Sequence, residues 1–141
     1  MSKKFKFHNL ETAPKRSKQL LKKLLASSES NGFYSVIAES PEALNAYNTL
    51  HNLFSSTSLT NEEKTVVWQT INVEHVCNFC VPAHTFMAKA MKIDDKVTDA
   101  LRDETPLPKP KLETLRNFTL TLVRKRGNAS DIEITEFIKA G

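Results

Sequence analysis

Helix-start signals recur along this chain of 141 residues and constrain its fold more than any other feature. Four segments open with residues that cap helix N-termini: Ser40-Pro41, Thr60 with Glu63, Asp94, and Ser130 with Glu133. The chain has only three glycines and no alternating run of β-branched residues, so little of it favours a sheet. The sequence therefore predicts an all-α fold.

Apolar residues at helical spacing follow these starts and predict about six to seven helices. The expected helices cover residues 14–25, 41–54, 60–71, 80–91, 94–101, 112–126 and 130–138. The segment 27–32 is expected to interrupt the chain after the first helix. Pro106, Pro108 and Pro110 exclude regular structure before the long helix that follows them, and Gly127 is expected to stop that helix.

Length and composition predict one soluble domain over residues 1–141, with 40% apolar and 26% charged residues. No stretch approaches the roughly 18 consecutive apolar residues of a membrane helix, and no apolar run follows the basic N-terminus as in a secretory signal. We therefore expect a cytoplasmic protein with no membrane partner. The chain ends about two to three turns into the last helix. We expect another subunit to cover part of that helix, or the C-terminus to be short.

The net charge of +4 comes largely from the first quarter of the chain, which includes a basic arm of about residues 1–12. Leucines recur at helical spacing behind the lysines that follow this arm, and no aromatic stacking platform accompanies the charge. This pattern is typical of a solvated arm and an amphipathic helix. We therefore expect no nucleic-acid partner.

The only two cysteines, Cys77 and Cys80, stand three residues apart, and His84 follows four residues after the second. Residues at these spacings share one face of a helix. Two thiols so placed can close a disulfide, and the imidazole can take or give a proton. In a reducing compartment such a pair is more often catalytic or metal-binding than structural.

Pro82 favours a helix that contains it in its first turn, which places Cys80 near the N-cap and Cys77 just before it. The helix dipole and His84 would then favour a Cys80 thiolate. Its attack on a peroxide oxygen would give a sulfenic acid, with which Cys77 would condense to a disulfide. In a continuous helix Glu74 would lie on the same arc, where it could orient the imidazole or relay a proton.

Two other interpretations of the cysteines stay open. Both could be buried core residues, since free cysteine is among the most buried residue types. A zinc site could use both cysteines with His84 and either Glu74 or His75, although no distant second pair of ligands is evident. His75 is more simply a residue near the surface, and His8 and His51, which have no chemical neighbours in the sequence, are also expected there.

Two stretches of the sequence resemble a known family. Residues 59–67 read LTNEEKTVV and residues 77–85 read CNFCVPAHT. They resemble the carboxymuconolactone decarboxylase family, and within it most closely the AhpD-like alkylhydroperoxidase branch. Shorter matching phrases extend the resemblance over nearly the whole chain, at residues 11–14, 38–44, 100–102, 105–108 and 122–127.

The resemblance implies an all-helical fold that assembles into homo-oligomers, either trimers or hexamers. Peroxidase members of the family reduce hydroperoxides with the cysteine pair and are recycled by a dithiol partner, such as a lipoyl- or thioredoxin-like protein, without a cofactor. By position, the resemblance makes Cys80 the peroxidatic cysteine, Cys77 the resolving cysteine, and His84 part of the proton relay. Decarboxylase members lack the cysteine pair, so that activity is disfavoured.

The chain departs from the peroxidase pattern at two positions. Thr65 stands where that pattern has its relay glutamate, and Phe79 stands where it can have a second histidine. Glu74, Glu62 or Glu63 would have to take over the relay, and Glu74 is favoured because it shares the cysteine face. These departures leave open a general thiol–disulfide oxidoreductase with little peroxidase activity, or a non-catalytic zinc-binding or redox-sensing protein.

Overall fold

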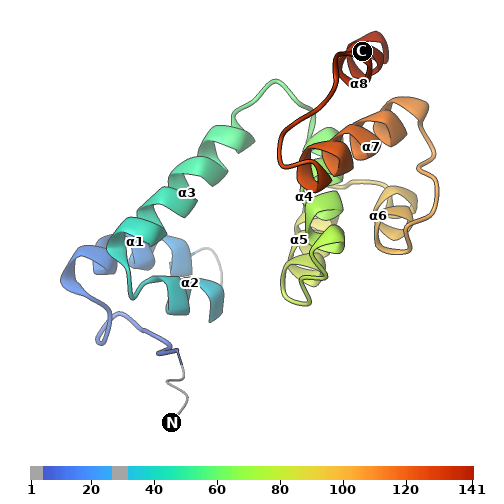
Figure 1. Ribbon diagram of the computed structural model, residues 1–141. Helices are drawn as coiled ribbons and strands as arrows, with labels where there is room; N and C mark the ends of the chain where they lie inside the picture. Colours follow the sequence, from blue (N-terminus) through green and yellow to red (C-terminus); the bar gives the residue numbers. More distant parts are fainter. Residues whose placement is uncertain (1–4, 27–31) are drawn as a thin grey trace. The chain divides into compact units, whose positions relative to one another are not determined.

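The computed structural model describes residues 5–26 and 32–141, and over these ranges it contains eight α-helices and no strands (Figure 1). The helices are α1 (Lys15–Ala26), α2 (Gly32–Ile37), α3 (Pro41–Ser55), α4 (Asn61–Glu74), α5 (Cys80–Ala90), α6 (Asp95–Arg102), α7 (Pro110–Arg124) and α8 (Asp131–Lys139). The all-α expectation is confirmed. The additional helix is α2, which has only six residues and is too short for a periodic pattern.

The expected helix starts are confirmed by their hydrogen bonds. The Ser40 hydroxyl accepts a hydrogen bond from the Ala43 amide, with Pro41 in the first position of α3. Both capping boxes are formed, at the starts of α4 and α8. The Asp94 carboxylate accepts from the Lys96 amide at 2.9 Å and caps α6. These contacts are local in sequence, which is why the sequence predicts them.

The chain divides into two compact units, residues 1–57 and residues 58–141. The single domain expected over the whole chain stays a prediction. Part of the expected basic arm, residues 1–4, and most of the expected break after the first helix, residues 27–31, lie outside the described residues.

In the first unit, α1 packs against α2 and α3. Its buried apolar residues include Leu21, Ala38 and Leu44. The buried Ser17 hydroxyl donates to the Ala38 carbonyl at 2.7 Å, which ties α1 to the residue that follows α2. The core of this unit is therefore small and is closed partly by hydrogen bonds.

The expectation that His8 lies at the surface is wrong. His8 is only 4% exposed, its Nδ1 lies 3.0 Å from the Thr12 carbonyl oxygen, and its Nε2 contacts the Glu39 carboxylate. Glu39 is 31 residues away in sequence, so nothing near His8 in the sequence indicated this contact. His51 is half-buried beside Tyr47, and burial lowers the pKa of its imidazole.

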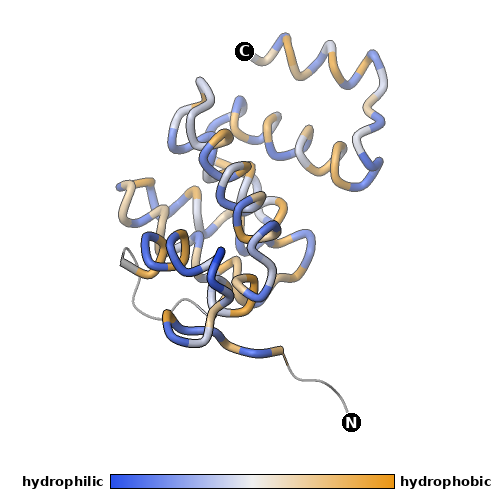
Figure 2. Tube along the Cα trace, turned by 90° about the vertical axis from the view of Figure 1, so that its left-hand side faces the viewer, coloured by the Kyte–Doolittle hydropathy of each residue, from blue (hydrophilic) through white to orange (hydrophobic). Residues whose placement is uncertain are grey.

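In the second unit, α4 packs against α5, α6 and α7, and α8 packs against α7. The core of this unit contains Val66, Val97, Ala100, Leu101, Leu107, Leu112 and Leu115. Hydrophobic and hydrophilic positions alternate along α7 and α8, the pattern of helices with one buried face (Figure 2). Over the described ranges, no helix combines the length and apolar character that crossing a bilayer requires.

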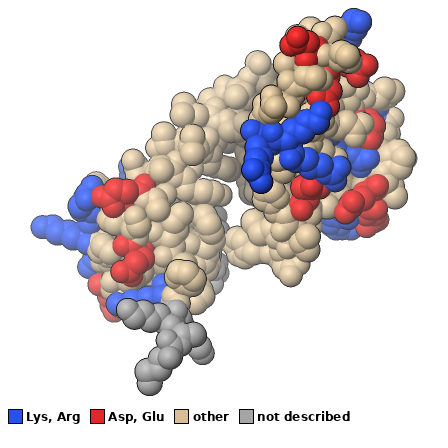
Figure 3. All heavy atoms as spheres, viewed as in Figure 1, with Lys and Arg blue, Asp and Glu red and all other residues tan. Residues whose placement is uncertain are grey.

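Basic side chains gather over the C-terminal end of α7 (Figure 3). Two of them are engaged in ion pairs within the second unit. Arg124 binds Glu74 at 2.8 Å, and Lys125 binds Glu133 at 2.7 Å. These cations hold α7 to α4 and α8.

Candidate redox-active site

The cysteines lie in the turn that joins α4 to α5. α4 ends at Glu74, residues 75–79 form the turn, and Cys80 is the first residue of α5. The continuous helix that would place Glu74 on the cysteine arc is therefore not formed. The Val76 amide donates to the Val73 carbonyl at 2.9 Å and the Cys77 amide donates to the Asn72 carbonyl at 3.0 Å.

This hydrogen-bond pair is a Schellman motif, in which the residue after the helix adopts the left-handed conformation. Val76 occupies that position with φ of 50°. A β-branched residue is strained in this conformation, because its Cβ crowds the backbone. The backbone before Cys77 is therefore strained at Val76. The Val76 side chain is 77% exposed, so its burial offsets little of the free-energy cost of this conformation.

Cys77 and Cys80 lie at disulfide distance, with Cα atoms 5.3 Å apart and both residues half-buried. The Cys80 amide also donates to the Cys77 sulfur at 3.2 Å. Pro82 is the third residue of α5, so the expectation that it lies in the first helical turn is confirmed. Cys80 stands at the helix start and Cys77 just before it, as the position of Pro82 predicts.

His84 lies four residues after Cys80 in α5, one helical turn further along the same face. The residue is half-buried, and its ring packs beside the half-buried Trp68 of α4, with ring centroids 5.2 Å apart. Trp68 thus holds the imidazole against α4 on the side of the helix that carries Cys80.

Gln69, at the centre of α4, was not recognised as a site residue from the sequence. It is fully buried, and its amide nitrogen donates to the Val81 carbonyl at 3.1 Å and to the Thr85 hydroxyl at 2.9 Å. The Asn72 side chain donates to the Gln69 amide oxygen at 3.1 Å. Because Asn72 also holds the Cys77 amide, this network fixes both sides of the cysteine turn. No sequence pattern singled Gln69 out, because the buried positions of α4 around it are mostly polar, as Thr65 and Thr70 are.

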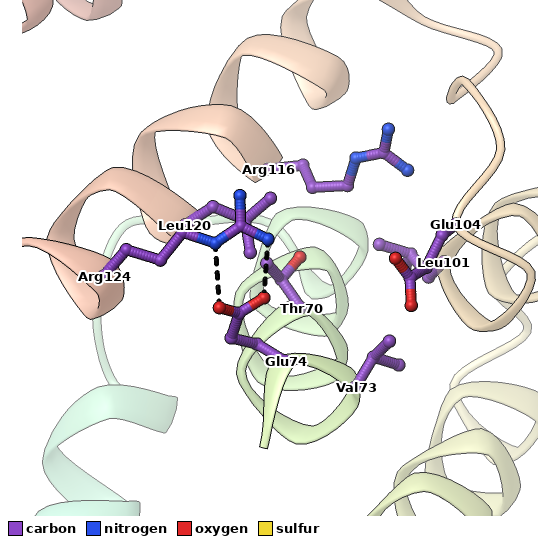
Figure 4. Close-up of a pocket in the computed structure, with 8 residues that line it drawn as sticks. All are labelled: Thr70, Val73, Glu74, Leu101, Glu104, Arg116, Leu120 and Arg124. Atoms are coloured by element: carbon purple, nitrogen blue, oxygen red, sulfur yellow. Dashed lines mark hydrogen bonds and ion pairs between the residues drawn. The ribbon is translucent and has the colours of Figure 1, made fainter. Parts of the chain in front are cut away.

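The structure gives each expected relay carboxylate another partner. Both Glu74 oxygens accept hydrogen bonds from Arg124 at 2.8 Å, at the edge of a cavity of about 90 Å³ between α4, α6 and α7 (Figure 4). Hydrogen bonding to the guanidinium lowers the pKa of Glu74. Glu62 binds Lys109 at 2.6 Å, and Glu63 completes the capping box at the start of α4.

Thr65, at the position of the relay glutamate in the peroxidase pattern, is buried and donates its hydroxyl to the Asn61 carbonyl at 2.8 Å. Phe79 is about half exposed at the start of α5. His75, which was expected near the surface, is exposed. Over residues 5–26 and 32–141, no group of three or more histidine, cysteine and acidic side chains is arranged to hold a metal ion.

The chain matches no protein-family model and no curated protein.

Proposed function

We propose that this protein is an antioxidant thiol peroxidase of the AhpD-like branch of the carboxymuconolactone decarboxylase family. The observation that carries the proposal is the Cys77–Cys80 pair, two sulfurs at disulfide distance at the start of α5. The resemblance of residues 59–67 and 77–85 to that family supports the choice of hydroperoxide as substrate.

In the proposed reaction, the Cys80 thiolate attacks the terminal oxygen of a hydroperoxide and breaks the O–O bond. The alkoxide leaves as an alcohol after taking a proton, which His84 supplies from one helical turn away. Cys77 then attacks the Cys80 sulfenic acid, releases water and closes the disulfide. A dithiol on a lipoyl- or thioredoxin-like protein returns the pair to two thiols and becomes a disulfide itself.

A buried network supports this cycle by keeping the cysteines in reach of each other. Gln69 holds the Val81 carbonyl next to Cys80, and Asn72 holds the Cys77 amide. A catalytic pair gains from such fixed placement, because less conformational freedom is lost when the bond forms. Buried hydrogen bonds of this kind orient reacting groups without touching the substrate.

A second candidate is a general thiol–disulfide oxidoreductase that turns over little peroxide. The engagement of Glu74 by Arg124 favours it, because a carboxylate held in a bidentate ion pair is a poor proton relay. The replacement of the pattern's relay glutamate by Thr65 points the same way. Both candidates use the same cysteine pair and differ in the oxidant.

One experiment separates the candidates. Wild-type protein, reduced and freed of excess reductant, is mixed with one equivalent of an alkyl hydroperoxide and its thiols are titrated. The peroxidase predicts the loss of two thiols per hydroperoxide and steady turnover with a dithiol donor. The oxidoreductase predicts reduction of a disulfide substrate with negligible loss of hydroperoxide.

Two matched variants test the assigned roles. Cys77→Ser should accumulate a sulfenic acid on Cys80, detected by mass spectrometry after trapping, and Cys80→Ser should lose turnover. Hydroperoxide consumption that survives Cys80→Ser unchanged contradicts the peroxidase mechanism. The family resemblance also leads us to propose an AhpD-like arrangement of the helices and a homo-oligomer, either a trimer or a hexamer.

A further inference from the structure

Two buried side-chain atoms of the described residues, the Thr70 hydroxyl oxygen and the Arg116 Nε, have no hydrogen-bond partner. Both residues line the cavity of about 90 Å³ between α4, α6 and α7 (Figure 4). Buried polar groups are nearly always paired in native structures, so each exception calls for an explanation. Two exceptions at the same cavity indicate that the cavity takes up a partner for both.

Thr70 differs from the other buried threonines. The hydroxyls of Thr65, Thr85 and Thr119 each donate at 2.8 Å to the carbonyl four residues earlier. Thr98 donates to the carbonyl three residues earlier, at 3.0 Å. This back-bonding is the usual way to satisfy a threonine hydroxyl within a helix. Thr70, which is only 4% exposed, makes no such bond, and its hydroxyl points into the cavity instead (Figure 4).

Arg116 is held in place by its two terminal nitrogens. Its Nη1 donates to the Thr105 carbonyl at 2.7 Å, and its Nη2 donates to the Glu113 carboxylate at 2.7 Å. The side chain is 14% exposed, and its Nε–H is left for an acceptor that enters the cavity. A guanidinium only donates hydrogen bonds, and a carboxylate is the acceptor that binds it most strongly. The inner wall of the cavity therefore favours a carboxylate.

The exposed side of the cavity favours a positive group instead. Glu104 and Arg124 are exposed there, and Arg124 is already paired with Glu74. The Glu104 carboxylate points into the cavity, where it can accept from a donor (Figure 4). Together with Arg116, these side chains give the lining two arginines and two glutamates. A ligand with no net charge and with ends of opposite sign matches this arrangement.

We propose that this cavity is a binding site for a small zwitterion, an α-amino acid with a short side chain. Its carboxylate accepts from the Arg116 Nε and the Thr70 hydroxyl, its ammonium donates to Glu104, and its side chain packs against Leu101 and Leu120. A cavity of about 90 Å³ holds roughly six to nine water molecules, which is the range of non-hydrogen atoms in alanine, serine and valine. Neither cysteine lines the cavity, so the proposal goes beyond the proposed function and does not depend on it.

Isothermal titration calorimetry of the full chain with L-alanine, L-serine and L-valine tests the ligand class. We expect at least one of them to bind with a millimolar or lower dissociation constant. Propionate and ethylamine each lack one of the two charges of alanine. Each should bind about tenfold more weakly than alanine, because it loses a charge-assisted hydrogen bond. No binding of any of the three amino acids at millimolar concentration overturns the proposal, and equal affinity for propionate overturns the zwitterion.

Variants of the lining test the location. Thr70→Val removes a hydroxyl that has no partner, so the urea midpoint should not fall, whereas the affinity for the amino acid should fall about tenfold. Glu104→Gln should weaken binding by a similar factor. Asp103→Asn, at an exposed neighbouring position outside the lining, should not. A lower urea midpoint in Thr70→Val would show that its hydroxyl already has a partner, and unchanged affinity in both lining variants would place the ligand elsewhere. Either result overturns this site.

Discussion

Gln69 is the residue on which the geometry of the cysteine turn depends. It has no exposed surface, and its amide group bonds to the Val81 carbonyl, the Thr85 hydroxyl and the Asn72 side chain. A buried polar group that loses its partner costs about 1–3 kcal/mol. Gln69 is therefore the side chain in α4 whose loss reaches both flanks of the cysteine pair.

We expect Gln69→Leu to lower the free energy of unfolding by about 1–3 kcal/mol, because it leaves buried partners without their hydrogen bonds. Urea denaturation measures this loss. Gln19→Leu is the matched control, since Gln19 is exposed on α1 and its replacement should change stability by less than about 0.5 kcal/mol. Equal effects of the two substitutions contradict the role assigned to Gln69.

Val76 has a left-handed backbone conformation in the turn before Cys77, and this conformation is unfavourable for a β-branched residue. Glycine adopts φ of 50° without steric cost, although it loses more conformational freedom on folding than valine does. Since Val76 is 77% exposed, we expect Val76→Gly to raise the free energy of unfolding by about 0.5–1 kcal/mol. Thermal denaturation of the reduced protein measures it.

A parallel and a control accompany this substitution. Lys92→Gly, at φ of 59° after α5, should stabilise in the same way. Asn117→Gly, at an exposed position in the middle of α7, should destabilise because glycine weakens a helix interior. A loss of stability in Val76→Gly would mean that the valine side chain makes contacts that outweigh its backbone strain.

At the scale of helices, starts are predictable from this sequence and ends are not. The hydroxyls of the capping residues Thr60 and Ser130 accept hydrogen bonds from amides three residues ahead, so a short sequence pattern is enough to predict these helix starts. Four helices instead end in the same left-handed turn, and glycine, the residue usually expected there, occupies none of these positions. Their left-handed residues are Val76, Lys92, Glu104 and Arg126.

Gly127 illustrates the difference. It was expected to stop α7, and it is left-handed with φ of 84°, but Arg126, the first residue after the C-cap Lys125, is already left-handed with φ of 56°. The Gly127 amide donates to the Leu122 carbonyl at 2.7 Å. No glycine or proline marks the end of α4 after Glu74 in the sequence. Because the helix ends there, Glu74 does not lie on the face that carries the cysteines. The part of the site within α5 was predicted because Pro82 and the i, i+4 spacing from Cys80 to His84 are local.

The two capping boxes make the second unit sensitive to acid. Hydrogen bonds from the Thr60 amide and from Lys111 lower the pKa of Glu63 to about 2. Hydrogen bonds from Lys125 and the Ser130 amide lower that of Glu133 to about 2. In the unfolded chain these carboxyls have a pKa near 4.5, so the folded state binds fewer protons between the two values.

We therefore expect the stability of the second unit to be fully present above about pH 4.5 and to fall as the pH drops toward 2. Urea midpoints at pH 6, 4.5 and 3 measure the slope. Glu63→Gln and Glu133→Gln should each flatten it, whereas Glu136→Gln, at an exposed position of α8, should not. A slope unchanged in both capping variants contradicts this origin of the acid sensitivity.

At the scale of the molecule, the contacts that the sequence did not reveal join residues far apart in the chain. Glu74 and Arg124 are 50 residues apart, and Glu62 and Lys109 are 47 apart. Charged residues have many possible partners at such separations, and local periodicity does not choose among them. The division into two compact units has no clear signal in the sequence either, because the segment between α3 and α4, residues 56–60, is short and ends in the capping residue Thr60.

The exposed isoleucines of α8 bear on the proposed assembly. α8 rests on α7 through the stacked rings of Phe137 and Phe118, whose centroids are 4.2 Å apart. Ile132 and Ile138 nevertheless remain 71% and 68% exposed. Exposed apolar side chains on one helix favour burial against another subunit.

If α8 forms part of a homo-oligomer interface, Ile132→Lys with Ile138→Lys should reduce the molar mass in solution toward that of one chain, 15.9 kDa. Association through α8 would bury the two lysines without partners. This costs several kcal/mol, which is enough to prevent association through a subunit interface of ordinary size. Sedimentation equilibrium measures the mass, and Thr135→Lys, at an exposed position on the same helix, is the control for added charge. A wild-type protein that sediments as a single chain contradicts the oligomer. An oligomer that survives both lysines places its interface away from α8.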